Sequence, residues 1–492
     1  MKITKHFFTA LVAIVPTLFI ACNKVDYYSA VEENTAELQI PSRERDVNVT
    51  PSEAATLAEL FANSSDGIAG IASKAGVKRS SKISSTATVR EDGQDLMYIF
   101  NYEDGGWVIV GSTREYYPIL AYSDEGKFEL QDDMGPVDVW LDETKVSIKN
   151  SSSLSDEEKS QMRSLWSHYE DAGLLAEKTK AARVLTKSTG EDYCWERIDS
   201  LQAIYGSDGW TFLPVSQVED LFTDLGLSND YATICYYSEQ NHSALNETVI
   251  GYRYPAINQV GPLLATEWHE GLPFNSLCPN QYPAGSGVIA TAQVMRYYAY
   301  PGSLTWNGTT IYWSEIPVSP DTTPNKIPQL IARIGQLCNA NYGASGTFLY
   351  HYDVMIGANS LGYTIDYDGG NNDSYYRNQV FNYQRPIIMF GTKSADPTKH
   401  YAWVCDGVRQ AVYNQLQFFT ENQPYGAGVF TQGMYTISNP GLIGQPIGTT
   451  IYTYHMNWGL QGGAYNGWFS ASYVYSEPIS YNNDRCSVLI YH

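Results

Sequence analysis

The sequence of 492 residues predicts an α+β protein in which two domains follow a short N-terminal leader. Three observations lead to this fold class. Residues 51–126 combine one helical pattern with short strand-like segments and glycine-rich turns. From residue 191 the composition changes to Tyr, Gly, Asn and Trp with frequent turns, which is typical of an aromatic-rich β sheet. Within that second region, residues 287–298 have a helical pattern with one apolar stripe.

The leader has the pattern of a bacterial lipoprotein signal peptide. An apolar stretch at residues 7–21 follows a basic start and is too short for a comfortable membrane span. Residues 19–22 read FIAC and resemble a lipobox, so Cys22 is the expected lipidation site; a plain signal peptide with an incidental cysteine is the alternative. We therefore expect a signal peptide at residues 1–22, a tether at residues 23–43, and a protein that is secreted or held at the bacterial cell envelope by lipid alone.

Charge and cysteine content exclude several kinds of partner. Lys and Arg number 31 against 53 Asp and Glu, giving a net charge of -22, so the phosphate backbone of a nucleic acid would be repelled. The cysteines after Cys22 lie far apart, with no C-x-x-C pair and no spacing to histidine that suits zinc, so we expect no metal and no cofactor. Their disulfide pairing stays open; they are Cys194, Cys235, Cys278, Cys338, Cys405 and Cys486.

The first domain is expected at residues 44–150 as a small α+β unit. A helix begins near residue 51, with Ser52 as its expected N-cap and with apolar residues spaced along one face. Short strands follow, separated by turns rich in Asp and Gly. We expect these strands at residues 96–102, 107–112 and 120–122.

Residues 151–190 connect the two domains. The spacing of Met162, Leu165 and Trp166 predicts a helix, and the Lys- and Ser-rich sequence after it predicts an exposed linker. The sequence leaves open whether this linker is cleaved. The second domain is expected at residues 191–492.

Four segments of the second domain resemble, in the same order, the streptopain family of cysteine peptidases. They are TEWHEGLPFNSLCP (266–279), AGSGVIATAQVMRYYAYP (284–301), RPIIMFGTKSADPTKHYAWVCDG (385–407) and HMNWGLQGGAYNGWF (455–469). In the first domain, residues 98–126 resemble the Spi-like prodomain of that family. Agreement of several segments in order is more specific than any one segment. The resemblance implies a papain-like cysteine peptidase fold preceded by a small, inhibitory α+β prodomain.

The resemblance also implies where the catalytic residues should stand. The family's nucleophile lies seven residues before a glutamine, and here that position before Gln293 is Ser286, so a hydroxyl replaces the thiol. The family's base lies five residues before the aspartate of a G-H-A-x-V-x-D-G strand, and that position here is Tyr401. His400 is one residue earlier. Because successive side chains on a strand point to opposite faces, we expect Tyr401 rather than His400 to face Ser286, unless a bulge re-aims His400.

Two further positions belong to the implied site. The family's oxyanion donor is a glutamine in W-x-Q, and here Glu270 follows Trp268 at that spacing. An ionised carboxylate accepts hydrogen bonds rather than donating them, so this position cannot stabilise an oxyanion while it is charged. Asn457 and Trp458 keep the family's N-W-G element, which orients the base, although residues 460–462 depart from the W-G-G that usually follows.

Together these replacements predict a pseudopeptidase. A serine hydroxyl needs a base more than a thiol does, and a phenol with a pKa of about 10 is a poor base. We expect the retained cleft to bind a peptide or protein ligand, the protein's own prodomain included. Two alternatives stay open: an active endopeptidase that uses Ser286 or an unusual arrangement of His400, and a surface glycan-binding or adhesin module built on the many Tyr and Trp residues. His269 and His351 are expected to be packing or surface residues, and His455 to support the N-W-G turn.

Overall fold

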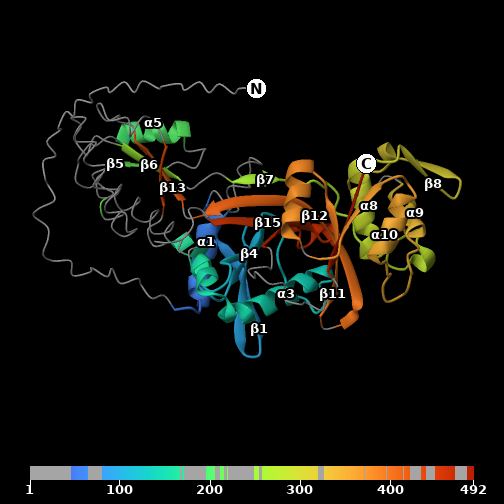
Figure 1. Ribbon diagram of the computed structural model, residues 1–492, viewed down its shortest axis with the longest axis horizontal. Coiled ribbons are helices and arrows are strands. Elements are labelled where there is room, and N and C mark those ends of the chain that lie inside the picture. The colour runs from blue at the N-terminus through green and yellow to red at the C-terminus, as the bar shows by residue number, and fades with distance from the viewer. Residues whose placement is uncertain are drawn as a thin grey trace, which may run out of the picture. The chain divides into compact units, whose positions relative to one another are not determined.

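Helices and antiparallel strands alternate along the chain, as Figure 1 shows. The structure is a computed structural model, and it describes residues 46–64, 80–163, 165–166, 169–170, 195–205, 211–214, 219, 249–253, 257–319, 326–370, 372–394, 396–413, 415–420, 434–438, 449–470 and 485–492. Several predicted features lie outside the described residues: the signal peptide at 1–22 with Cys22, the tether at 23–43, the linker near 180–190, Cys194 and Cys235. The mixture of helices with antiparallel strands confirms the predicted α+β class.

The main feature of residues 47–492 is a sheet to which eleven of the described strands contribute. Its order is β1-β2-β3-β4-β16-β15-β12-β11-β17-β10, with β7 added beside β12. The strands are β1 (Ile83–Glu91), β2 (Gln94–Tyr102), β3 (Trp107–Gly111), β4 (Ile119–Ser123), β7 (Asn258–Val260), β10 (Thr364–Asp368), β11 (Ile387–Lys393), β12 (Asp396–Tyr413), β15 (Thr449–Asn457), β16 (Gly467–Ser470) and β17 (Cys486–Tyr491). One sheet therefore carries strands of both predicted domains.

The first helix, α1 (Pro51–Asn63), begins at the predicted position, but its N-cap lies two residues earlier than the sequence suggested. Its N-cap is Thr50 and not Ser52. Thr50 and Glu53 form a capping box, in which the Thr50 N–H donates to the Glu53 carboxylate at 2.8 Å and the Glu53 N–H donates to the Thr50 hydroxyl at 3.3 Å. Pro51 explains the shift, because proline is favoured at the first helical position, where no backbone donor is needed.

Three of the first domain's strands were predicted and two elements were missed. β2, β3 and β4 agree with the expected segments to within two residues. β1 was missed because it is mostly exposed and rich in Ser and Thr, so it lacks a strong apolar alternation. The helix α3 (Pro136–Asn150) was also missed, although Pro136 at its first turn and Lys149 in its last turn are ordinary helix signals.

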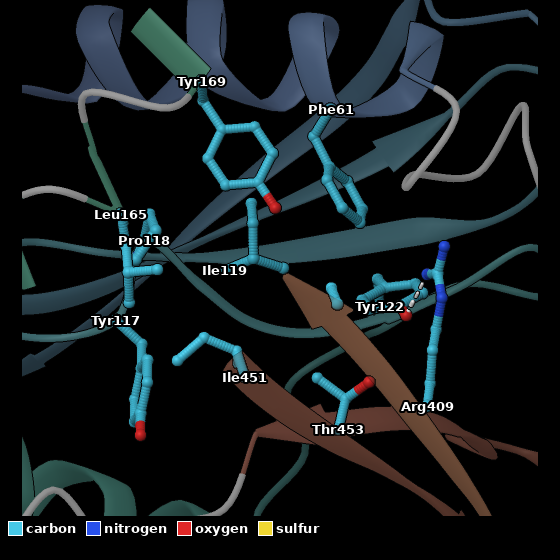
Figure 2. A pocket seen from close by; sticks show the side chains of 11 residues that line it. Phe61, Tyr117, Pro118, Ile119, Tyr122, Leu165, Tyr169, Arg409, Ile451 and Thr453 are labelled. Carbon is cyan, nitrogen blue, oxygen red and sulfur yellow. Dashed lines mark hydrogen bonds between the residues drawn. The ribbon is translucent and has the colours of Figure 1, made fainter. Parts of the chain in front are cut away.

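The first domain is joined to the strands of the second domain by a shared sheet and core. β4 pairs with β16, which places Tyr122 opposite Trp468. The ring of Phe469 in β16 lies 4.9 Å from that of Trp140 in α3. A small cavity of about 30 Å³ lies at this junction. Figure 2 shows the side chains that line it, among them the Arg409 guanidinium of β12, which donates to the Tyr122 hydroxyl. These buried contacts fix the first domain against β12, which carries part of the candidate site.

Alternation along the central strands divides the second domain's core into two sides. Ile388 and Phe390 of β11 pack in a cluster with one group of helices, whereas Ile387 and Met389 pack in a cluster that contains α3 residues. The first group of helices lies together at one end of the sheet in Figure 1. It consists of α8 (Ser286–Tyr298), α9 (Ile327–Leu337) and α10 (His351–Asn359).

The remaining described elements lie outside this main sheet. They are α5 (Trp195–Tyr205), a four-stranded sheet of β5 (Thr211–Pro214), β6 (Val249–Arg253), β13 (Gln415–Thr420) and β14 (Met434–Ser438), the hairpin β8 (Ser303–Trp306) and β9 (Thr309–Tyr312), and α11 (Asp373–Arg377). Among the described residues, none of the helices has the length and apolar character needed to cross a membrane. Cys278, Cys338 and Cys405 are buried free thiols, and Cys486 is buried as well.

Candidate active site

Ser286 is the first residue of α8, and glycines hold it there. Gly285 has φ of 91°, a conformation that disfavours other residues, and a Cβ at this position would lie 3.0 Å from Thr347. A Cβ at Gly287 would lie 2.9 Å from Leu349. Glycine is therefore favoured on both sides of Ser286. The Ser286 side chain stands at the start of the helix with only 8% of the residue exposed.

Gln293 of α8 joins three of the segments that carry the family resemblance. Its side-chain oxygen accepts from the Trp268 N–H at 3.1 Å, and its amide group donates to Asn457 Oδ1 at 3.2 Å. Asn457 in turn donates to the Thr266 carbonyl at 2.7 Å. Both amide side chains are buried, where a lost hydrogen bond is costly. The residue that located Ser286 in the sequence is thus a structural hub of the site.

Four of the sequence-predicted site residues line one cleft of about 580 Å³: Ser286, His400, Tyr401 and Glu270. The first domain contributes a second wall that the sequence did not predict. This wall is the segment before α3, with Gln131, Asp133, Met134 and Gly135. The loop at residues 345–348, Lys399 and Tyr465 also line the cleft.

The hydroxyl of Ser286 is bonded to the backbone of β12 and not to a basic side chain. Its oxygen accepts from the Ala402 N–H at 3.0 Å. Within the described residues, neither the His400 ring nor the Tyr401 ring has a hydrogen bond to Ser286. The arrangement therefore lacks the direct nucleophile–base contact that activates a serine.

His400 does not turn away from the cleft as the sequence reasoning expected. It lines the same cleft as Ser286, and it leaves β12 on the side of Ala402, which packs in the cluster around α8. Its Nδ1 is hydrogen-bonded to the Thr392 hydroxyl at 3.0 Å, opposite it on β11. The ring also packs beside Phe348, with a centroid distance of 6.0 Å. His400 and Tyr401 do point to opposite faces of β12, as predicted, but it is His400 that lies on the face towards α8.

Tyr401 leaves β12 on the other side and meets the first domain. Its hydroxyl donates to Asp133 at 3.3 Å, and Asp133 also pairs with Lys399 at 2.6 Å. Burial, and then the negative charge of Asp133, hold the pKa of Tyr401 well above its ordinary value of 10. Lys399 lowers the pKa of Asp133 and so keeps that charge in place. Tyr401 is a neutral phenol that anchors the first domain, and it is not placed to act as a base.

Glu270 stands at the mouth of α8. Its backbone carbonyl accepts from the Ala284 N–H at 2.9 Å. Burial raises the pKa of its carboxyl group to about 7, while hydrogen bonding from the N–H groups of Gly285 and Ser286 opposes the rise and the charge of Asp133 adds to it. An oxyanion that forms at the start of α8 would need a hydrogen-bond donor at this position, and an ionised carboxylate there would repel it.

Replacing Glu270 with Gln is expected to change how stability depends on pH. The pKa of Glu270 is about 7 in the folded chain against an ordinary 4.5, so the folded state binds the proton more tightly and Glu270 makes stability fall as pH rises through this window. As pH rises from about 4.5 to about 7, the free energy of unfolding of Glu270→Gln should increase relative to that of the wild type. Above this range the difference between the two should stay constant. Urea unfolding at a series of pH values measures the difference. A difference that does not vary with pH would contradict the raised pKa.

Asn457 and Trp458 lie outside the lining of the cleft. In the described part of the chain, the side-chain hydrogen bonds of Asn457 go to Gln293, Thr266 and Gly459, and none goes to His400. The Trp458 ring is buried 5.4 Å from that of Trp403. The Asn457–Trp458 element therefore supports the site through Gln293 and Thr266 and does not orient His400.

The other histidines considered from sequence do not reach Ser286 by any described hydrogen bond. His269 accepts from the Gly271 N–H at 3.2 Å and packs against Phe274. His455 Nδ1 lies 2.6 Å from a carboxylate oxygen of the fully buried Asp406. The contact between His455 and Asp406 joins β15 to β12, close to the N-W-G turn that His455 was expected to support.

Comparison with known proteins identifies the first domain. Residues 46–148 match the family described as Spi protease inhibitor. We call these residues the Spi-type domain. The match confirms the predicted resemblance of the first domain to a Spi-like prodomain, and the Asp133 wall of the cleft belongs to this domain. Among curated proteins, none matches the chain.

Two solved structures from Prevotella intermedia are similar to the chain. A mutant fragment of prointerpain A is 14% identical, covers 82% of this chain and 97% of its own, and superimposes with a TM-score of 0.43. Active wild-type interpain A, a cysteine protease, is 18% identical, covers 47% of this chain and 94% of its own, with a TM-score of 0.31.

Proposed function

We propose that the chain is a catalytically impaired homologue of the streptopain-type peptidases that binds a peptide or protein segment in the cleft around Ser286. The observation that carries this proposal is the bonding of Ser286, whose hydroxyl accepts from the Ala402 N–H and, among the described residues, has no hydrogen bond to His400 or Tyr401. Glu270, which lines the same cleft at the position of the family's amide donor, supports it. Membrane attachment through Cys22 is proposed on the sequence pattern alone.

The shape and lining of the cleft support binding as its use. A cleft of about 580 Å³ lies within the size range of sites that hold small ligands or a few residues of a peptide. One ligand is already suggested by the chain itself, because residues 131–135 of the Spi-type domain form part of the wall. Tyr401 and Lys399 hold this segment through Asp133. A second polypeptide that reaches the open part of the cleft would be bound without being cut.

An active endopeptidase is the second candidate, and the position of His400 favours it. His400 lines the same cleft as Ser286, so a rotation that gives up its hydrogen bond to Thr392 could bring a ring nitrogen towards the hydroxyl. Cleavage would, however, have to proceed with the Glu270 carboxyl group at the position where the family has an oxyanion donor. We therefore rank this candidate below the binding function.

The two candidates differ in what happens to an unfolded protein that is added to the full chain. Lysozyme that has been reduced and carboxamidomethylated is a suitable probe, because it is an extended, basic polypeptide. We expect the wild-type chain to bind it in biolayer interferometry and to leave it intact during long incubation. Ser345→Trp, which fills the cleft from an exposed position, should weaken binding. Fragmentation of the probe that disappears in Ser286→Ala would instead establish the endopeptidase.

A further inference from the structure

An unbroken path of aromatic rings leads out of the cleft across the surface of α10. We name these residues the aromatic ridge: Phe348, His400, Tyr350, Tyr352, His351 and Tyr367. Successive ring centroids along it are 6.0, 5.7, 5.2, 5.6 and 5.0 Å apart. The Tyr350 and Tyr352 rings are stacked at an interplanar angle of 9°, and the His351 and Tyr367 rings at 20°. The first two members line the cleft, so the ridge is continuous with it.

The outer part of the ridge is exposed. Tyr350, Tyr352 and Tyr367 are 45%, 49% and 44% exposed, and Ile356 beside them on α10 is 57% exposed. Rings that pack on one another while facing solvent lose little freedom when a partner covers them, and clusters of this kind mark interaction surfaces. Burial lowers the pKa of His351, so its ring is uncharged at neutral pH. The ridge thus offers neutral ring faces with hydroxyl groups at their edges.

A strand edge and a carboxylate lie beside the aromatic ridge. Tyr367 belongs to β10, which pairs with β17 on one side; among the described strands, none pairs with its other side. An extended polypeptide can add to such an edge through backbone hydrogen bonds. Asp353 follows Tyr352 in the first turn of α10, and its carboxylate accepts from the Tyr350 N–H at 3.2 Å. Asp366 and Asp368 alternate with Tyr367 on β10 and so face the other side of the strand, where Asp366 accepts from the Tyr375 hydroxyl at 2.9 Å. A carboxylate beside a neutral aromatic surface attracts a basic ligand.

We propose that the aromatic ridge is a docking surface for an extended polypeptide that carries apolar and basic side chains and enters the cleft from this side. The inference rests on the proposed binding function and names the kind of ligand. Continuity with the cleft sets the path, the ring faces take apolar side chains, and the Asp353 carboxylate, together with the net charge of -22, favours Lys or Arg. The Spi-type segment at residues 131–135 lines the cleft but is not part of the ridge, so the ridge is the surface a second polypeptide can meet first.

The test compares ridge and control variants of the full chain in binding reduced, carboxamidomethylated lysozyme. Changing Tyr350→Ser together with Tyr352→Ser should weaken binding about tenfold, because exposed aromatic anchors dominate such interfaces. The matched control changes Tyr312→Ser together with Tyr383→Ser, which are 54% and 56% exposed and lie outside the ridge, and binding should not change. Thermal unfolding of both double variants should match the wild type, since all four side chains are on the surface.

Charge gives an independent readout. The wild type should bind reduced lysozyme more tightly than reduced, carboxymethylated α-lactalbumin, which is acidic, and added salt should narrow this preference. Asp353→Asn, which removes the carboxylate beside Tyr350, should narrow it as well.

The outcomes separate the two proposals. No binding of either probe by the wild type would overturn the binding function and the ridge together. Binding that Ser345→Trp weakens and the ridge variant leaves unchanged would overturn the ridge alone. Binding of a neutral oligosaccharide such as maltoheptaose that depends on Tyr350 and Tyr352, with lysozyme binding unaffected, would assign the ridge to glycans and overturn the polypeptide ligand.

Discussion

The combined variant Ser286→Cys and Glu270→Gln is expected to cleave casein, whereas the wild-type chain is not. The two changes supply a thiol at the start of α8 and an amide donor in place of a carboxyl group, and His400, which lies on the α8 side of β12, is the available base. A positioned base contributes about 10²–10⁴ to rate and an oxyanion donor about 10²–10³. Because such groups act as a unit, Ser286→Cys alone should stay nearly silent.

Casein fragments and cleavage of the chain itself provide the readouts for this variant. Iodoacetamide should abolish the restored activity, because only the new thiol is placed to attack. The matched control carries Ser286→Ala with the same change at position 270, and it should be inactive. Strong cleavage by the wild type that Ser286→Ala removes would refute the pseudopeptidase account. A silent double variant with native stability would show that the β12 register, which bonds Ser286 to Ala402, no longer supports catalysis.

The sequence-predicted residues around Ser286 are tied together by short-range geometry. Gln293 set the position of Ser286 within one helix, and the structure shows why that spacing holds, since Gln293 bonds Trp268 and Asn457 at once. Glycine on each side of Ser286 is likewise a local requirement of the helix start. Where a helical register or a buried amide fixes a position, counting residues is a sound method.

Other parts of the site depend on contacts between distant segments. The Asp133 wall comes from the Spi-type domain and meets Lys399 and Tyr401 of β12, more than 260 residues later in the chain. Nothing in the local pattern of residues 131–135 indicates this role. The direction of His400 was misjudged for a related reason: alternation gives opposite faces, but only the packing of α8 decides which face meets the helix. At α1, a local rule was missed, because Pro51 moves the N-cap to Thr50.

The junction between the Spi-type domain and the rest of the chain is expected to depend strongly on Glu143. This residue of α3 has no exposed side-chain surface, and its carboxylate lies 3.3 Å from the Arg485 Nε, whose side chain is 13% exposed. The Arg485 guanidinium also lies over the Trp403 ring at 4.5 Å. Removing the carboxylate leaves a buried positive charge without this partner, which typically costs about 3–5 kcal/mol. Glu143→Ala should therefore lower the free energy of unfolding by an amount in that range.

An exposed pair within the same Spi-type domain provides the control. Lys82 and Glu103 are 2.6 Å apart with side chains 73% and 44% exposed, and Glu103→Ala should lower the free energy of unfolding far less than Glu143→Ala does. Denaturant unfolding of both variants measures the contrast. Replacing Glu143 and Arg485 together with Met should recover much of the loss, because an apolar pair of similar volume removes the buried charge. If Glu143→Ala costs no more than Glu103→Ala, the buried contact does not hold α3 against the sheet, and the Spi-type domain must be retained by the β4–β16 pairing and its aromatic core.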